Sequence, residues 1–216
     1  MTAVWTRPRL LASVLLAAIA WLGGCTCAGS LRPLQSDEPL TLIPDLSGKW
    51  VSEEKNSNEK EYYLIENAGG PAYRVTSVHQ DEELQDIYDL SLVQVGSYTF
   101  FDAAFKEAGN KETSKSAYDL GVLPIHFIGR IWADGDNLRL GLLDYDWLNQ
   151  MTSSGKLKLP YVEQNQGGDD HILLLTAESD KLKEFVRQYA ESGAFSMVVN
   201  LHRVPLAVEP TANSKR

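Results

Sequence analysis

The side chains best suited to covalent chemistry near the start of the chain are two thiols, Cys25 and Cys27, and the chain has no other cysteine. A thiolate is both a nucleophile and a metal ligand, so either cysteine could be acylated, oxidised or metallated. Small residues run up to the first of them in the sequence Leu22-Gly23-Gly24-Cys25. A processing peptidase needs small residues at its cleavage site, so Cys25 is the stronger candidate for modification.

The residues before Cys25 predict a cleaved secretory signal over residues 1–24. Arg7 and Arg9 precede an apolar run over residues 10–22. Thirteen helical residues reach roughly 20 Å, which is shorter than the hydrocarbon core of about 30 Å. No basic stop-transfer cluster follows the run, which argues against a membrane span. An ordinary signal peptidase site is the alternative, since it also needs small residues.

With Leu22 three residues before the cysteine and only glycines between them, this segment resembles the lipobox of bacterial lipoproteins. The resemblance implies that the Cys25 sulfur takes a diacylglycerol group, that the Gly24–Cys25 bond is cut, and that the new amine is often acylated with a chain such as palmitate. Two or three acyl chains hold a protein on a membrane essentially permanently. We therefore expect an anchored protein of the bacterial cell envelope. Thr26 stands where an aspartate would favour the inner membrane, so the outer membrane is expected in a diderm.

The second cysteine has no partner within the chain once Cys25 is a thioether, so no intramolecular disulfide is predicted. A redox site, an intermolecular bridge and no role at all stay open for Cys27. No helix amino terminus or cationic pocket is suggested nearby to lower its pKa, which favours the last of these.

The histidines do not predict a metal site. His79, His126, His171 and His202 are spread through the chain without a His-x-x-x-His pair. Asp134, Asp136 and Asn137 carry oxygens that suit calcium but lack the downstream glutamate of an EF-hand, so a hairpin turn explains them. The run 169–171 follows two glycines and is expected to be a solvated turn. We predict no metal and no cofactor.

No catalytic constellation can be identified either. Ser97, Ser153, Ser154 and Ser196 lack Gly-x-Ser-x-Gly surroundings. Carboxylate pairs such as 53/54 and 144/146 would need a defined separation across a cleft. We expect a non-enzymatic binding or structural domain whose partner is a small apolar ligand or an envelope protein. An envelope hydrolase with a site hidden from the sequence is the alternative.

The charge balance excludes nucleic acid as a partner. Removing residues 1–24 removes Arg7 and Arg9 and no acid, so the formal net charge of −9 becomes −11. Membrane association is expected to depend on the acyl chains on Cys25 rather than on a basic surface.

The mature chain divides into three parts. Residues 25–45, with Pro33, Pro39 and Pro44, predict the lipidated cysteine followed by an extended tether, which as a coil spans roughly 25 Å. Residues 46–205 form one β-rich domain, and residues 206–216 form a polar tail.

Strand signals dominate the domain, at 48–51, 61–66, 73–79, 87–95, 97–101, 125–133, 137–143, 171–176 and 195–203. Leu138, Leu140 and Leu142 alternate with their neighbours, which predicts one buried face. Asp144 and Ser179 are expected to cap two short helices. The stretch 106–117 has no apolar period and predicts an exposed loop. The fold class is mainly β with two short helices, a single antiparallel meander that forms a lipocalin-like or partly open barrel.

Gly48-x-Trp50 resembles the motif that begins the first strand of lipocalins. The resemblance implies that Gly48 lets the chain pass closely under the barrel floor, that Trp50 plugs the floor, and that Arg203 covers Trp50 in a cation–π contact. The helix expected before the last strand departs from that family. The order of elements from Leu142 to Trp147 onward is also similar to that of bacterial lipoproteins with no assigned activity.

A closed barrel of this kind could hold a small apolar ligand. The aromatic candidates for lining it, which could equally fill the core, are Tyr63, Tyr73, Phe100, Phe127 and Trp132.

Overall fold

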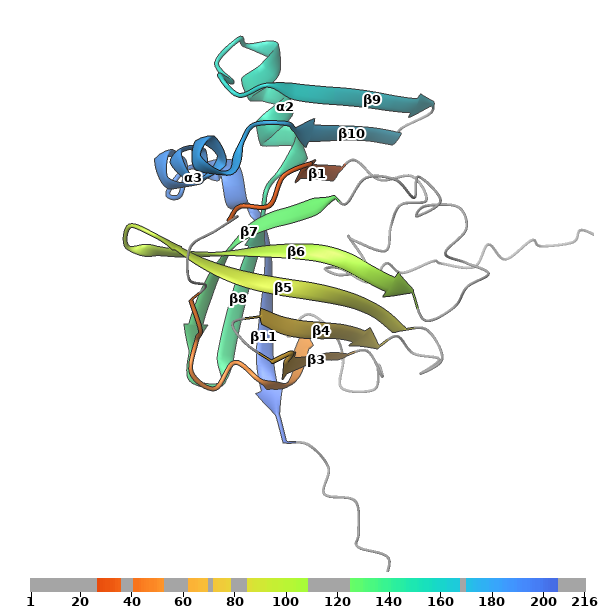
Figure 1. The fold of residues 1–216 in the computed structure, drawn as a ribbon, viewed down its shortest axis with the longest axis vertical. Coiled ribbons are helices and arrows are strands. Elements are labelled where there is room, and N and C mark those ends of the chain that lie inside the picture. The colour runs from red at the N-terminus through yellow and green to blue at the C-terminus, as the bar shows by residue number, and fades with distance from the viewer. Residues whose placement is uncertain are drawn as a thin grey trace, which may run out of the picture.

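The structure, a computed structural model, describes residues 27–35, 41–52, 62–69, 72–78, 85–108, 125–167 and 170–205. Eight strands close into an antiparallel barrel, which confirms the predicted fold class (Figure 1). In chain order they are β2 (Gly48–Ser52), β3 (Tyr62–Asn67), β4 (Ala72–Val78), β5 (Gln85–Val95), β6 (Tyr98–Ala108), β7 (His126–Asp134), β8 (Asn137–Leu142) and β11 (Met197–Val204).

Each barrel strand pairs with its neighbour in the chain, β6 pairs with β7, and β11 closes the ring between β8 and β2. The alternation predicted on β8 is real, since Leu138, Leu140 and Leu142 face the barrel interior together with Leu201 of β11. The segment 134–137 is the tight β7–β8 hairpin turn that its residues predicted.

A second unit is inserted between β8 and β11. It consists of helix α2 (Tyr145–Ser153), β9 (Tyr161–Gly167), β10 (Asp170–Leu175), helix α3 (Ser179–Gln188) and the short 3-10 helix η1 (Gly193–Phe195). Strand β1 (Cys27–Ser30) pairs in parallel with β10 and touches the start of β7 at Ser30 and His126. The strands β1, β10 and β9 therefore extend the barrel sheet to one side (Figure 1).

Two apolar cores hold the molecule together. The first fills the barrel, and the second lies between the outer face of β5–β7 and the inserted helices. In the second core Phe100 packs on Phe195 with ring centroids 5.5 Å apart, and Leu182 of α3 is fully buried. The insertion is thus fixed to the barrel wall by burial of apolar surface.

The prediction of a tether over residues 25–45 is wrong for its described parts. Residues 27–30 form β1, Leu34 is completely buried, and the main-chain N–H of Thr41 donates to the Leu92 carbonyl at 2.9 Å. Pro33 does not prevent packing, because it lies after the four residues of β1 and its carbonyl accepts a hydrogen bond from Ser179. The folded domain therefore begins near residue 27 and not at residue 46.

The two helices were predicted, with one correct cap. Asp144 caps α2, and its carboxylate accepts from the Trp147 N–H at 2.9 Å. Ser179 is the first residue of α3 rather than its cap, because its hydroxyl donates to the Pro33 carbonyl at 2.7 Å. The Ser179 hydroxyl thus makes a long-range hydrogen bond to Pro33 in place of a local helix-capping bond.

Several predictions lie outside the described residues: the signal 1–24, Cys25, His79, the polar tail 206–216, and most of the loop 106–117, whose first residues belong to β6. None of the helices described here is long and apolar enough to cross a membrane.

Candidate functional site

The barrel floor is built around Trp50 and Arg203, which are opposite each other on β2 and β11. The Arg203 guanidinium carbon lies 4.5 Å from the Trp50 ring centroid, within the range of about 6 Å for a cation–π contact. Trp50 is 1% exposed, and its indole N–H donates to the Leu46 carbonyl at 3.0 Å. The floor is therefore sealed by an aromatic ring with its one polar atom satisfied.

The same arginine ties three segments together. Its guanidinium donates to the carbonyls of Ser47 (2.6 Å) and Asp45, and its Nε lies 3.0 Å from an Asp136 carboxylate oxygen. Gly48 has φ +154, and a Cβ there would lie 2.6 Å from an Arg203 nitrogen. The glycine is needed both for its backbone conformation and for this close approach.

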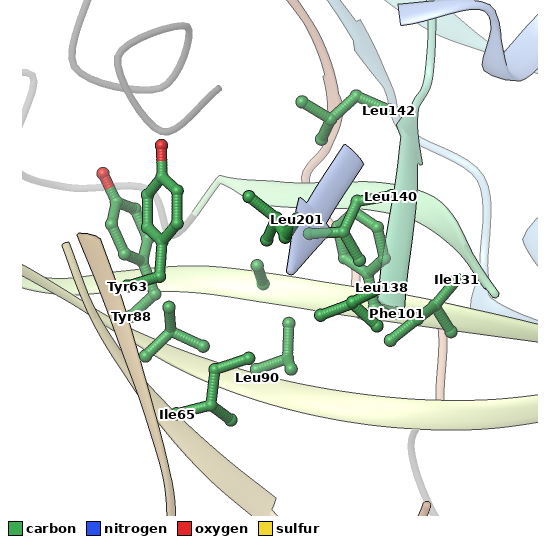
Figure 2. A pocket seen from close by; sticks show the side chains of 12 residues that line it. Tyr63, Ile65, Tyr88, Leu90, Phe101, Ile131, Leu138, Leu140, Leu142 and Leu201 are labelled. Carbon is green, nitrogen blue, oxygen red and sulfur yellow. The ribbon is translucent and has the colours of Figure 1, made fainter. Parts of the chain in front are cut away.

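Above the floor the barrel contains a cavity of about 40 Å³ with only apolar surface facing it (Figure 2). Its lining side chains come from seven strands: Tyr63, Ile65, Val75, Tyr88, Leu90, Phe101, Ala103, Ile131, Leu138, Leu140, Leu142 and Leu201. Drug-sized ligands occupy pockets of about 300–1,000 Å³. The cavity as it stands has room for about three water-sized groups, so it fits a small or slender apolar group.

The two ends of the cavity differ. Ile131 and Leu138 lie at one end, beside the β7–β8 turn that contacts Arg203, and Tyr63 and Tyr88 stand together at the other (Figure 2). Tyr88 is fully buried and meets the Phe105 ring edge-on, with centroids 5.5 Å apart. Tyr63 pairs with Trp50 across β3 and β2, so the tyrosine end of the cavity also borders a floor residue.

One glycine makes room for the cavity wall. Gly129 of β7 is the direct partner of Phe101 on the adjacent strand β6, and a Cβ at position 129 would lie 2.2 Å from the Phe101 ring. The ring lies flat across β7 because no side chain opposes it there.

The five aromatic candidates are placed differently. Tyr63 lines the cavity, and Phe127 is part of the barrel core. Tyr73 belongs to that core near the floor, where its hydroxyl donates to the Ile43 carbonyl at 3.0 Å and burial raises its pKa above 10.0. Phe100 faces outward into the second core. Tyr88 and Phe101 also line the cavity and were not predicted to, although they carry the same alternation as the predicted candidates.

Trp132 also lies outside the barrel, so its assignment to the cavity is wrong. The guanidinium carbons of Arg130 and Arg139 lie 4.4 and 4.2 Å from its ring centroid. Arg130 is held by the Ala190 carbonyl at 2.7 Å and by Glu191 at 3.0 Å. This stack ties the barrel wall to the end of α3, and its position follows from the alternation of β7, since Ile131 faces inward.

A buried histidine–carboxylate pair, which the sequence did not predict, lies on the outer wall. His126 Nδ1 lies 2.7 Å from one Asp102 oxygen, and the Leu34 N–H donates to the other at 2.6 Å. Asp102 is 5% exposed, and the His126 side chain is 15% exposed. The pair is covered by the N-terminal segment and fastens that segment to the barrel.

The remaining histidines do not gather. His171 of β10 stacks on Tyr145 with ring centroids 6.3 Å apart, and His202 lies opposite Asn137 at the floor end of β11. Burial raises the pKa of Tyr145, and the charges of Glu163 and Asp146 add to this. Among the residues with described positions, no group of three or more His, Cys, Asp or Glu side chains could hold a metal ion.

The comparisons with known proteins add no relatives: no protein-family model, no curated protein and no solved structure matches the chain.

Proposed function

We propose that this chain is a lipid-anchored protein of the bacterial cell envelope, in the outer membrane if the bacterium is a diderm, and that its barrel is a non-enzymatic module that binds a small apolar ligand. The observation that supports ligand binding is the apolar cavity above a floor sealed by Trp50 and Arg203. The signal and the cysteine at position 25 support the anchor.

A hydrolase is not favoured by the histidine–carboxylate pair. A general base must come within hydrogen-bond reach of its substrate. Both oxygens of Asp102 are engaged, and the buried Leu34 lies beside them. The pair therefore holds the N-terminal segment against the barrel through Leu34 and does not line a cleft.

The location is tested by fractionating cells that produce wild-type protein, Cys25→Ser or Cys27→Ser. The account predicts that wild type and Cys27→Ser sediment with membranes and that Cys25→Ser is soluble, because only the sulfur at position 25 carries the lipid. Membrane association of Cys25→Ser equal to that of wild type would refute the anchor.

Ligand binding is tested on Cys25→Ser protein purified without detergent, by native mass spectrometry for a retained ligand and by xenon NMR with xenon as the added small apolar probe. Ala103 is 3% exposed and lines the cavity, whereas Ala104 is its outward-facing neighbour on β6. Ala103→Leu adds about three carbon atoms and should fill the space, so it should abolish a retained or added ligand. Ala104→Leu should leave binding unchanged. Binding that survives Ala103→Leu, or no binding by the Cys25→Ser parent, would reject this part of the proposal.

A further inference from the structure

The proposed lipid anchor lies unexpectedly close to the folded domain. Only Thr26 separates Cys25 from strand β1, which begins at Cys27. Two residues span at most about 7 Å. An acyl group on Cys25 would therefore begin within about that distance of the sheet, in place of the roughly 25 Å that a twenty-residue coil would provide.

The segment that carries the anchor is held firmly on the domain. Residues 27–30 pair with residues 172–175 of β10, and the Leu31 N–H donates to the Leu175 carbonyl at 2.9 Å. Beyond β1, the Leu34 N–H bonds to Asp102 and the Pro33 carbonyl accepts from Ser179. These contacts hold residues 27–34 against the domain.

The same extension ends in a basic and apolar edge. β9 is the last strand of the sheet, and Tyr161 and Val162 at its start are 42% and 52% exposed. Exposed Lys156 and Lys158 precede them, and the Lys158 ammonium donates to the Gly155 carbonyl at 3.0 Å rather than to a carboxylate. On a chain with net charge −9, this pairing of lysines with exposed apolar side chains suits an anionic lipid surface.

Register sets the distance from this edge to β1. Tyr161 pairs with Leu175, which pairs with Ser30, so two strand spacings of roughly 10 Å in all separate Tyr161 from the Ser30 end of β1. Cys27, at the anchor end of β1, lies three residues, about 10 Å, farther along the strand. Tyr161 and Val162 are successive residues and point to opposite faces of the sheet, so both meet a membrane only if it approaches the edge. An open sheet edge cannot enter hydrocarbon, which limits its depth to the hydrated headgroups.

We infer that the β1–β10–β9 extension is a membrane-contacting surface that rests edge-on, through residues 156–162, on the headgroups of the bilayer that holds the anchor. This inference rests on the proposed acylation of Cys25. Glu163 follows Val162 on β9 and is an exposed acid that opposes the charge of the two lysines.

Depth-dependent fluorescence quenching tests the inference. Acylated mature protein in a Cys27→Ser background carries one fluorophore, at Val162→Cys or at the matched control Leu42→Cys, which is 47% exposed. Segment 41–47 crosses the barrel on the side opposite the extension (Figure 1). The vesicles contain phosphatidylethanolamine and phosphatidylglycerol in a ratio of about 3:1, which gives an anionic surface. A lipid with a nitroxide on its headgroup serves as the quencher.

The expected result is quenching at position 162 at least threefold stronger than at position 42. Adding Lys156→Glu and Lys158→Glu should reduce the difference without changing the acyl mass, since each lysine near an anionic surface favours contact about fivefold. Equal quenching at positions 162 and 42 of an acylated protein would overturn this inference and leave the proposed anchor standing. Absence of the acyl mass would overturn both this inference and the anchor.

Discussion

Arg203 does more at the barrel floor than cover Trp50, because its planar guanidinium also donates to two backbone carbonyls. A lysine keeps the charge but not this forked geometry. We predict that Arg203→Lys lowers the free energy of unfolding by about 1–3 kcal/mol, measured by chemical denaturation.

Arg139→Lys is the matched control, since Arg139 also lies over a tryptophan but is exposed. The control should change stability by less than about 0.5 kcal/mol. Equal effects of the two substitutions would show that the carbonyl contacts contribute nothing.

Gly48 should tolerate alanine worse than other glycines with positive φ. A Cβ at position 48 would meet Arg203, which cannot move without losing its bonds, whereas a Cβ at Gly135, with φ +58, meets nothing within 4 Å. Gly135→Ala carries backbone strain of about 1 kcal/mol. Gly48→Ala adds the steric conflict and should cost roughly 1 kcal/mol more in the same denaturation experiment. A smaller loss for Gly48→Ala than for Gly135→Ala would contradict the geometry.

We predict that ionisation of Tyr73 lowers the free energy of unfolding at alkaline pH. Burial raises the pKa of its phenol above the model-compound value of 10.0, so near pH 10 and above the folded state holds a proton that the unfolded state releases. The stabilisation is complete below pH 10 and decreases as the pH rises through the folded pKa. Denaturation across pH 8–11 should show a smaller decrease for Tyr73→Phe than for wild type. An equal or steeper decrease for the variant would exclude Tyr73 as the cause.

Residue patterns predicted part of the site. The sequence predicted the floor residues Gly48, Trp50 and Arg203 because their roles depend on backbone spacing and strand ends. It predicted the inward-facing leucines of residues 138–142 because alternation along a strand is a local pattern. Asp102 and His126 could not, because their partnership arises from the pairing of β6 with β7 and from Leu34, sixty-eight positions away from Asp102. Trp132 was misplaced because an aromatic on a strand suits either face.

Among the elements, β1 and the segment after it have the largest consequence for function, since they turn an expected tether into part of the domain. Leu34 is fully buried in the second core, whereas Leu42 in the same part of the chain is 47% exposed. We predict that Leu34→Ala lowers the free energy of unfolding by about 2–5 kcal/mol and makes residues 27–35 sensitive to proteolysis. Leu42→Ala should change it by less than about 0.5 kcal/mol. If the Leu34→Ala protein were as stable as wild type, residues 27–35 would be a tether and not part of the folded domain.

The strands that the sequence did not predict are the ones with the weakest local signals. β1 has four residues, Cys-Ala-Gly-Ser, and β9 begins with Tyr-Val-Glu-Gln-Asn-Gln, which lacks alternation. Both form because β10, an apolar strand that was predicted, offers a partner on each side. Such strands are specified by tertiary pairing, which a single sequence pattern does not contain.

At the scale of the whole molecule, the barrel and the β1–β10–β9 extension form one arrangement. The barrel is closed at the floor by Trp50, and β1 connects its wall at β7 to the β10–β9 edge. An acidic chain would be repelled weakly by anionic lipid, so the proposed attachment would require the acyl group. If Cys25 is acylated as proposed, only Thr26 separates that group from β1, which would restrict the orientations of the domain on the membrane.

The most direct test of this account is the intact mass of the wild-type protein recovered from bacterial membranes. The account predicts a chain that begins at Cys25 and carries the added mass of a diacylglycerol group, with or without a third acyl chain. A membrane-free, unmodified chain, or a working form that still carries residues 1–24, would contradict it.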